Sequence, residues 1–282
     1  MTFNSEQAKA WLKNNVLSLV PANSRRYTFG DVSLKLGTNM LGLPADLKPI
    51  EGTVIHSDDG FYVVKTGRAE FKFVDPSLLK QELELDSKVR ITPYARRRFN
   101  GTLLSDPEKI EDTGTGFISR TYAIGVRHSV IPVSEPSTVY GQQMLELLHH
   151  GKCTDGVRVI SNLLVDCNAK NFRLQEPPAV DEETGESLGP YVDPQIQFDC
   201  MTSKFTGEVT IGVDVAADVY YVELKKPDAG GVLQMHAKCE QVYFDRMAEV
   251  LGNLLCDGQW KFAKVEVLKR APKRKQTEAV AA

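Results

Sequence analysis

Residues 53–74 read TVIHSDDGFYVVKTGRAEFKFV, and this stretch decides the fold expected for the first part of the chain. Three runs rich in β-branched and aromatic residues are separated by the turn sequences SDDG at 57–60 and TG at 66–67. In the last run Phe71 and Phe73 alternate with charged residues, as in a strand that buries one face. The stretch therefore predicts three short strands joined by tight turns.

The segments on either side extend this prediction. Downstream, residues 88–92 and 100–104 have strand character, and short strands with turns about every eight to twelve residues are typical of a small closed or half-closed barrel. Upstream, the spacing of apolar residues predicts a helix over 5–20, ended by Pro21, and a second short helix over 28–36. Residues 1–104 are thus expected to form a helical cap and a small β-barrel-like domain.

The rest of the chain predicts a second domain, so that the overall class is α+β. Residues 105–116 carry few large apolar side chains and are expected to be a linker. Residues 117–268 predict a mixed α+β domain with antiparallel strands, and 269–282 are expected to be a disordered basic tail. Within the second domain the expected strands are 117–133, 207–215, 219–224 and 260–268, with a strand or a strand pair at 157–160 and 163–165. The expected helices are 137–150 and 232–255.

Charge and composition narrow the function classes. The 282 residues include 34 lysines and arginines and 37 acidic residues, a net charge of −3, so any binding of nucleic acid must be local rather than driven by bulk charge. No apolar run approaches the roughly 18 residues of a membrane-spanning helix. The five cysteines are odd in number and far apart, which argues against a disulfide framework. We expect a cytoplasmic protein without membrane contact.

The densest positive charge outside the tail is the triplet at 96–98, which lies between two strand-like segments. Guanidinium groups pair with phosphates, and flanking aromatic rings stack on unpaired bases, a combination that barrel loops use to bind single-stranded nucleic acid. The alternative is a solvated loop whose arginines pair with the acidic run at 82–86. The predicted nucleic-acid contacts are Lys88, Arg90, Tyr94, Arg96, Arg97, Arg98 and Phe99, with Lys273, Arg274 and Lys275 of the tail.

A second motif has the spacing of a metal-dependent nuclease of the PD-(D/E)xK type. Glu223 and Lys225 stand two residues apart on an expected strand, so both side chains lie on one face. In such enzymes an upstream aspartate, here Asp214 or Asp199, completes a site for a divalent metal, and the lysine orients or activates water. The Glu-x-Lys spacing is also common by chance, and no Pro-Asp pair precedes it at a suitable distance.

Together these residues favour a non-enzymatic accessory protein that binds nucleic acid, preferably single-stranded, through the loop at 94–99. Accessory factors of mobile elements, phages and replication systems provide an analogy. A protein–protein adaptor or inhibitor is the first alternative, because the chain is slightly acidic and lacks other catalytic motifs. The nuclease is the second alternative, and only it would use a divalent metal; otherwise no cofactor or resident metal is expected. The sequence leaves the oligomeric state and the identity of any partner open.

Overall fold

The computed structural model describes residues 3–111, 114, 116, 118–121, 125, 128–178 and 189–271. Its contacts divide the chain into two compact units. Unit 1 comprises Met1–Gly37, Asp46–Tyr94 and Lys261–Ala282, and unit 2 comprises Thr38–Ala45 and Ala95–Trp260. Unit 1 is therefore assembled from three separate segments, whereas the sequence predicts one continuous domain over 1–104.

Unit 1 begins with the helix predicted over 5–20. Helix α1 runs Ser5–Leu19, and the side chain of Asn4 caps it by accepting hydrogen bonds from the backbone N–H groups of Glu6 and Gln7. Its buried residues Ala8, Leu12 and Val16 are spaced by four and form one face. This helix is confirmed.

The second predicted helix, over 28–36, is wrong. Residues Thr28–Val32 form strand β1, which pairs in parallel with strand β6 (Glu70–Val74) in the register Phe29↔Phe71. The segment contains Gly30, a poor helix former, and its aromatic and β-branched residues suit a strand. Pairing with an existing sheet therefore outweighs a weak helical spacing.

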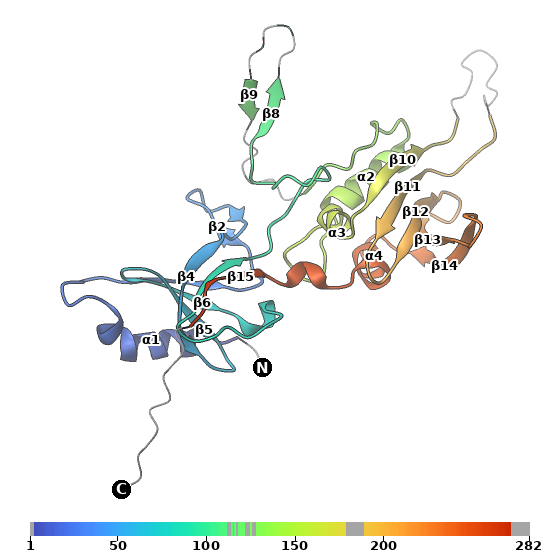
Figure 1. The fold of residues 1–282 in the computed structure, drawn as a ribbon. Coiled ribbons are helices and arrows are strands. Elements are labelled where there is room, and N and C mark those ends of the chain that lie inside the picture. Colours follow the sequence, from blue (N-terminus) through green and yellow to red (C-terminus); the bar gives the residue numbers. More distant parts are fainter. Residues whose placement is uncertain are drawn as a thin grey trace. The chain divides into compact units, whose positions relative to one another are not determined.

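The central meander of unit 1 confirms the strands expected over 53–74. Strands β4 (Ile50–Ser57), β5 (Tyr62–Gly67) and β6 pair antiparallel in sequence order. β7 (Lys88–Thr92) pairs with β4, and the C-terminal strand β15 (Lys264–Lys269) pairs with β7. The prediction that this last strand belongs to the second domain differs from the structure, because the N-terminal sheet provides its partner (Figure 1).

The expected barrel does not close in the part of the chain that the structure describes. The sheet order is β1-β6-β5-β4-β7-β15, so β1 and β15 remain as two edges. Apolar side chains cover both faces of this sheet instead. One face packs against α1 through Phe61, Val63, Phe71 and Phe73, and the other carries Val54, Tyr62, Val64, Val74 and Ile91.

Unit 2 combines an antiparallel sheet with three helices. The sheet runs in sequence order through β10 (Lys170–Gln175), β11 (Gln195–Met201), β12 (Thr206–Asp214), β13 (Val219–Pro227) and β14 (Leu233–Val242). The helices are α2 (Val139–His150), α3 (Ile160–Asp166) and α4 (Met247–Leu255). One face of the sheet and all three helices contribute to a single core, which includes Met144, Leu164, Phe198, Ile211 and Leu251.

The secondary structure of unit 2 agrees with the sequence in part. The helix over 137–150 and the strands near 207–215 and 219–224 are confirmed. Of the strand or strand pair expected over 157–165, residues from Ile160 onward belong to helix α3, and Val159 forms an isolated β-bridge with Lys152. The helix expected over 232–255 is strand β14 followed by α4. Within the described residues of the strand expected over 117–133, the structure has β9 (Ile118–Thr121), which pairs with β8 (Glu108–Glu111) inside the expected linker.

The remaining elements are short: β2 (Gly37–Thr38), β3 (Pro44–Ala45), and the 3-10 turns η1 (Pro76–Leu78) and η2 (Gln259–Lys261). The described residues thus form an α+β fold. Among them, no helix is both long and apolar enough to cross a membrane. The expected tail lies outside the described residues from position 272 onward.

Candidate nucleic-acid interface

The predicted arginine loop is a tight hairpin whose side chains mostly stabilise the hairpin itself. Arg96 is buried, with 3% of its surface exposed, and Arg97 pairs with Leu103 across the turn. The Arg98 guanidinium donates to the carbonyl oxygens of Leu103 and Asp106, at 2.6 and 2.9 Å, and forms an ion pair of 3.0 Å with Glu108.

The aromatic residues beside this loop are also used in packing. Phe99 contacts Phe172 edge-on, with ring centroids 4.9 Å apart, at the border of the unit 2 core. Tyr94 is half-buried at the end of a unit 1 segment. Arg97 is the exposed member of the triplet, and its guanidinium donates to the Gly101 carbonyl oxygen at 2.9 Å. The loop therefore does not present three arginines and a stacking ring to a ligand.

The other predicted cations are divided between ion pairs and the undescribed tail. Glu51 accepts from both Lys88 at 2.6 Å and Arg90 at 3.0 Å, and these two hydrogen bonds lower the pKa of its carboxyl group. Arg90 also lies 3.8 Å from Glu266 on β15. Lys273, Arg274 and Lys275 lie outside the described residues. Lys88 and Arg90 thus contribute little uncompensated charge.

The Glu-x-Lys motif lies on the face of β13 that points away from the core of unit 2. Thr210 of β12 is directly opposite Glu223, whereas Asp214 is opposite Val219 near the hairpin turn. Four residues of extended strand separate Asp214 from that position, or about 13 Å. Asp214 accepts a hydrogen bond from the Ala217 backbone at the turn, so the structure does not bring it to Glu223.

Around Glu223 the charged side chains form an ion-pair ladder across four strands. Lys225 lies 3.7 Å from Glu223 and 4.0 Å from Glu208, and Lys238 lies 3.4 Å from Glu223. The ladder continues through Arg173 to Glu208 at 2.6 Å and through Lys238 to Glu240 at 2.8 Å. Asp199, the other aspartate considered for the metal site, lies in β11 opposite Glu208 of β12. The residues described contain no group of three metal-ligating side chains with suitable geometry.

Charge is distributed unevenly between the two units. Unit 1 contains nineteen lysines and arginines against thirteen acidic residues, a formal charge of +6. Unit 2 contains fifteen against twenty-four, a formal charge of −9. The net charge of −3 is therefore the sum of a basic unit 1 and an acidic unit 2, and we expect unit 1 to attract a polyanion.

Unit 1 presents an arginine–aromatic strip at its β1 edge: Arg25, Arg26, Tyr27 and Phe29. Tyr27 and Phe29 are 38% and 45% exposed, their ring centroids are 6.3 Å apart, and alternation along the strand places both rings on one side. The buried ring of Phe73, 5.6 Å from Phe29, supports the strip from below. Arg25 and Arg26 are exposed and form no ion pair within the described residues.

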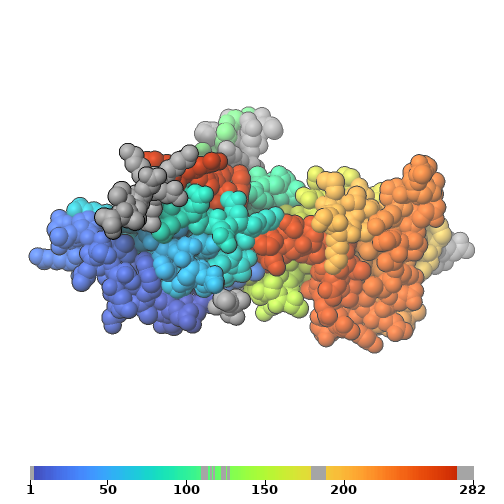
Figure 2. All heavy atoms as spheres, turned by 60° about the horizontal axis from the view of Figure 1, so that its bottom comes forward, coloured from blue at the N-terminus to red at the C-terminus, as the bar shows by residue number. Residues whose placement is uncertain are grey.

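Sequence reasoning missed this strip because residues 28–36 were expected to be helical, which would separate the rings. The signal that could have found it is the sequence RRYTF at 25–29, a basic pair followed by aromatic residues at strand spacing. In Figure 2 the N-terminal part of unit 1, in blue, lies at the surface. The strip replaces the loop at 94–99 as the candidate interface.

Comparisons with family models, curated proteins and solved structures find no match to this chain.

Proposed function

We propose that this chain is a non-enzymatic, cytoplasmic protein that binds single-stranded nucleic acid through the arginine–aromatic strip of unit 1. The observation that carries the proposal is the side-by-side exposure of Tyr27 and Phe29 next to two arginines without an ion-pair partner in the described structure. Five free cysteines in the structure suit a reducing compartment.

The chemistry of the strip matches unpaired nucleotides. Guanidinium groups pair with phosphate oxygens through two parallel hydrogen bonds, and every base can stack on an aromatic ring. Phe29 is held by Phe73, so stacking on it requires little further ordering. The +6 charge of unit 1 adds long-range attraction to the phosphate backbone.

The test is fluorescence anisotropy of a labelled single-stranded oligonucleotide over a range of salt concentrations. The double variant Arg25→Ala/Arg26→Ala should weaken binding and reduce the slope of log affinity against log salt by about 1.4, as expected for two phosphate contacts on a single strand. The variant Tyr27→Ala/Phe29→Leu should weaken single-strand binding roughly tenfold or more through lost stacking. Leucine at position 29 keeps the apolar cover over Phe73.

Unit 2 provides a matched control. Tyr243 and Phe244 are exposed by 59% and 70%, and both belong to the acidic unit. The variant Tyr243→Ala/Phe244→Ala should bind the oligonucleotide as the unmodified protein does. Unchanged affinity and salt slope in both strip variants would exclude the strip. If the unmodified protein binds no nucleic acid at all, the adaptor or inhibitor hypothesis becomes the better one.

The geometry does not favour the nuclease. Glu223 is already held by two lysines, and the acid expected beside it is replaced by Thr210. The ion-pair ladder gives Glu223 and Lys225 a structural role on the outer face of the sheet.

A further inference from the structure

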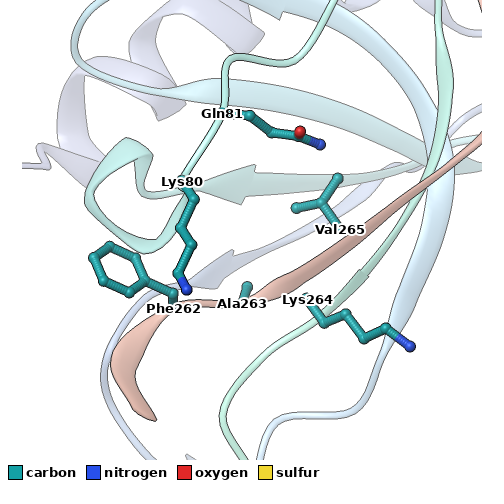
Figure 3. Close-up of a pocket in the computed structure, with 6 residues that line it drawn as sticks. All are labelled: Lys80, Gln81, Phe262, Ala263, Lys264 and Val265. Carbon is teal, nitrogen blue, oxygen red and sulfur yellow. The ribbon is translucent and has the colours of Figure 1, made fainter. Parts of the chain in front are cut away.

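The two sheets differ in what lies beside their edge strands. In unit 1 the start of β15 is bordered by residues 78–81, because the backbone N–H of Ala263 donates to the Leu78 carbonyl at 2.8 Å. A pocket of about 350 Å³ remains there, where the Lys80 ammonium lies 5.2 Å from the centre of the Phe262 ring (Figure 3). In unit 2, β14 is the last strand of the sheet, and among the described residues it pairs with β13 alone. Its outer backbone groups can therefore pair with another strand.

The open edge at β14 is long and has exposed apolar side chains at both ends. With ten residues, β14 is the longest strand that the structure describes, and seven of the ten are exposed. Leu233 and Met235 are exposed near its start, and Tyr243 and Phe244 are exposed directly after its end. Large apolar side chains that gather along one edge are typical of an interaction surface.

The charges of β14 are arranged about Cys239 so that the strand is complementary to itself. Lys238 and Glu240 flank Cys239 and lie on the outer face of the sheet, 2.8 Å from each other. If two copies pair antiparallel with Cys239 at the centre, Lys238 of each copy lies opposite Glu240 of the other. A centre at Lys238 or at Glu240 would instead place like charges opposite each other. A lysine on an edge strand ordinarily discourages pairing, but here the nearby acid gives it a partner in the second copy.

We propose that β14 is the interface of a homodimer, in which the β14 strands of two copies pair antiparallel about a two-fold axis at Cys239. The two five-stranded sheets then form one continuous sheet, and the ion-pair ladder extends through Lys238 and Glu240 into the second copy. The antiparallel direction also brings the apolar start of one strand toward Tyr243 and Phe244 of the other, which buries exposed apolar surface on both copies.

Irregularities in β14 limit the extent of this contact. The pairing of β14 with β13 is regular over Ala237–Cys239, and its register shifts on both sides of this stretch. Because bulges bend and twist a strand, we expect regular pairing between the copies over the same short stretch and a dimer in the micromolar range. The inference does not depend on the arginine–aromatic strip, which lies in unit 1.

Analytical ultracentrifugation of the full chain in reducing buffer, over a range of micromolar concentrations, tests the proposal. We expect a reversible equilibrium between monomer and dimer. Lys238→Glu and Glu240→Lys should each weaken the dimer roughly tenfold, because the two-fold axis repeats the like-charge contact, and Lys238→Glu/Glu240→Lys should restore it. Arg173→Glu is the matched control, since it makes the same charge change in the same ladder but in β10, at the other edge of the sheet. Circular dichroism establishes that each variant is folded.

A cross-link through Cys239 tests the register independently. The axis places the two Cys239 Cβ atoms about 4.5–5.5 Å apart, within reach of a short bismaleimide that adds one thiol at each end. Cys239→Ala should abolish the cross-linked dimer, whereas Cys256→Ala, which removes the other cysteine that is not fully buried, should keep it.

Three results would overturn the proposal: a protein that stays monomeric at all concentrations, single charge variants that dimerise as the unmodified protein does, or a cross-linked dimer that persists in Cys239→Ala. Arg25→Ala/Arg26→Ala should leave the dimer unchanged. Failure of the strip and failure of the β14 edge are therefore distinguishable.

Discussion

At the scale of single residues, the imidazole of His149 must stay neutral to keep a hydrogen bond inside unit 2. Its Nε2 accepts a hydrogen bond of 3.0 Å from the Ile131 backbone N–H, and the rings of His128 and His150 lie 5.3 and 6.2 Å away. Burial, followed by the charges of these two histidines, lowers the pKa of His149 to about 4. A protonated ring could no longer accept from Ile131. The depressed pKa therefore links the stability of unit 2 to pH.

The sign of this linkage gives a prediction. Because the folded pKa of His149 is below the unfolded value of about 6.5, the stabilisation is fully present above pH 6.5 and is lost as pH falls toward 4. We expect a loss of up to about 2 kcal/mol in unfolding free energy, reduced by partial solvent exposure. His149→Gln retains an acceptor for Ile131 and does not titrate. Urea unfolding at pH 7 and pH 4.5 should show a smaller pH dependence for this variant, and an equal dependence would contradict the linkage.

At the scale of elements, the start of helix α2 depends on a glycine. The Glu176 carboxylate accepts hydrogen bonds from the backbone N–H and hydroxyl groups of Ser137 and Thr138, at 2.5 to 2.9 Å. These bonds lower the pKa of Glu176 against the opposing effect of burial. A Cβ at Gly141 would clash with this carboxylate and would lie 3.0 Å from Pro136 and Thr138 side-chain atoms. The carboxylate cannot move aside without losing its hydrogen bonds.

Gly141→Ala should therefore destabilise the protein by about 1–3 kcal/mol, although alanine is the better helix former by roughly 1 kcal/mol. Gly252→Ala in α4 is the matched control. The nearest atom to a Cβ there is Leu163 Cδ1 at 3.7 Å, which is an ordinary contact, so this variant should be neutral or slightly more stable. Thermal unfolding of both variants tests the pair. If Gly141→Ala is more stable than the unmodified protein, the hydrogen bonds from Ser137 and Thr138 do not hold the Glu176 carboxylate in place.

Sequence reasoning missed the elements in which the intrinsic helix or strand preference of the residues differs from the conformation that strand pairing or core packing imposes. Leu233, Met235 and Ala237 alternate as in a strand, but this segment is rich in good helix formers. Pairing with β13 decides in favour of strand β14. Conversely, β-branched residues at 157–160 predict a strand, yet Leu163 and Leu164 are buried by helix formation in α3. Where alternation and turn signals agreed, as over 53–74, the prediction was confirmed.

The candidate site was harder to predict than the fold. The triplet at 96–98 is visible in the sequence, but burial of Arg96 and the packing of Phe99 on Phe172 depend on contacts between distant segments. Local patterns therefore identified the residue types that are suited to contact nucleic acid, whereas long-range contacts decide which of these residues are accessible.

At the scale of the whole molecule, the division of charge follows the division into units. All members of the unit 2 core lie within residues 95–260, a continuous stretch of chain. Unit 1, in contrast, needs β15 from the C-terminal end to complete its sheet. A fragment of residues 95–260 therefore keeps its own core and carries all of the −9 charge.

This fragment should fold alone and should not bind nucleic acid. It lacks the arginine–aromatic strip, and its net negative charge repels a phosphate backbone. Circular dichroism with a cooperative thermal transition establishes that it is folded, and anisotropy with the labelled single strand then compares it with the full chain. We expect no binding by the fragment at salt concentrations where the full chain binds. A folded fragment with the affinity of the full chain would place the interface in unit 2 and would return the exposed Arg97 to consideration.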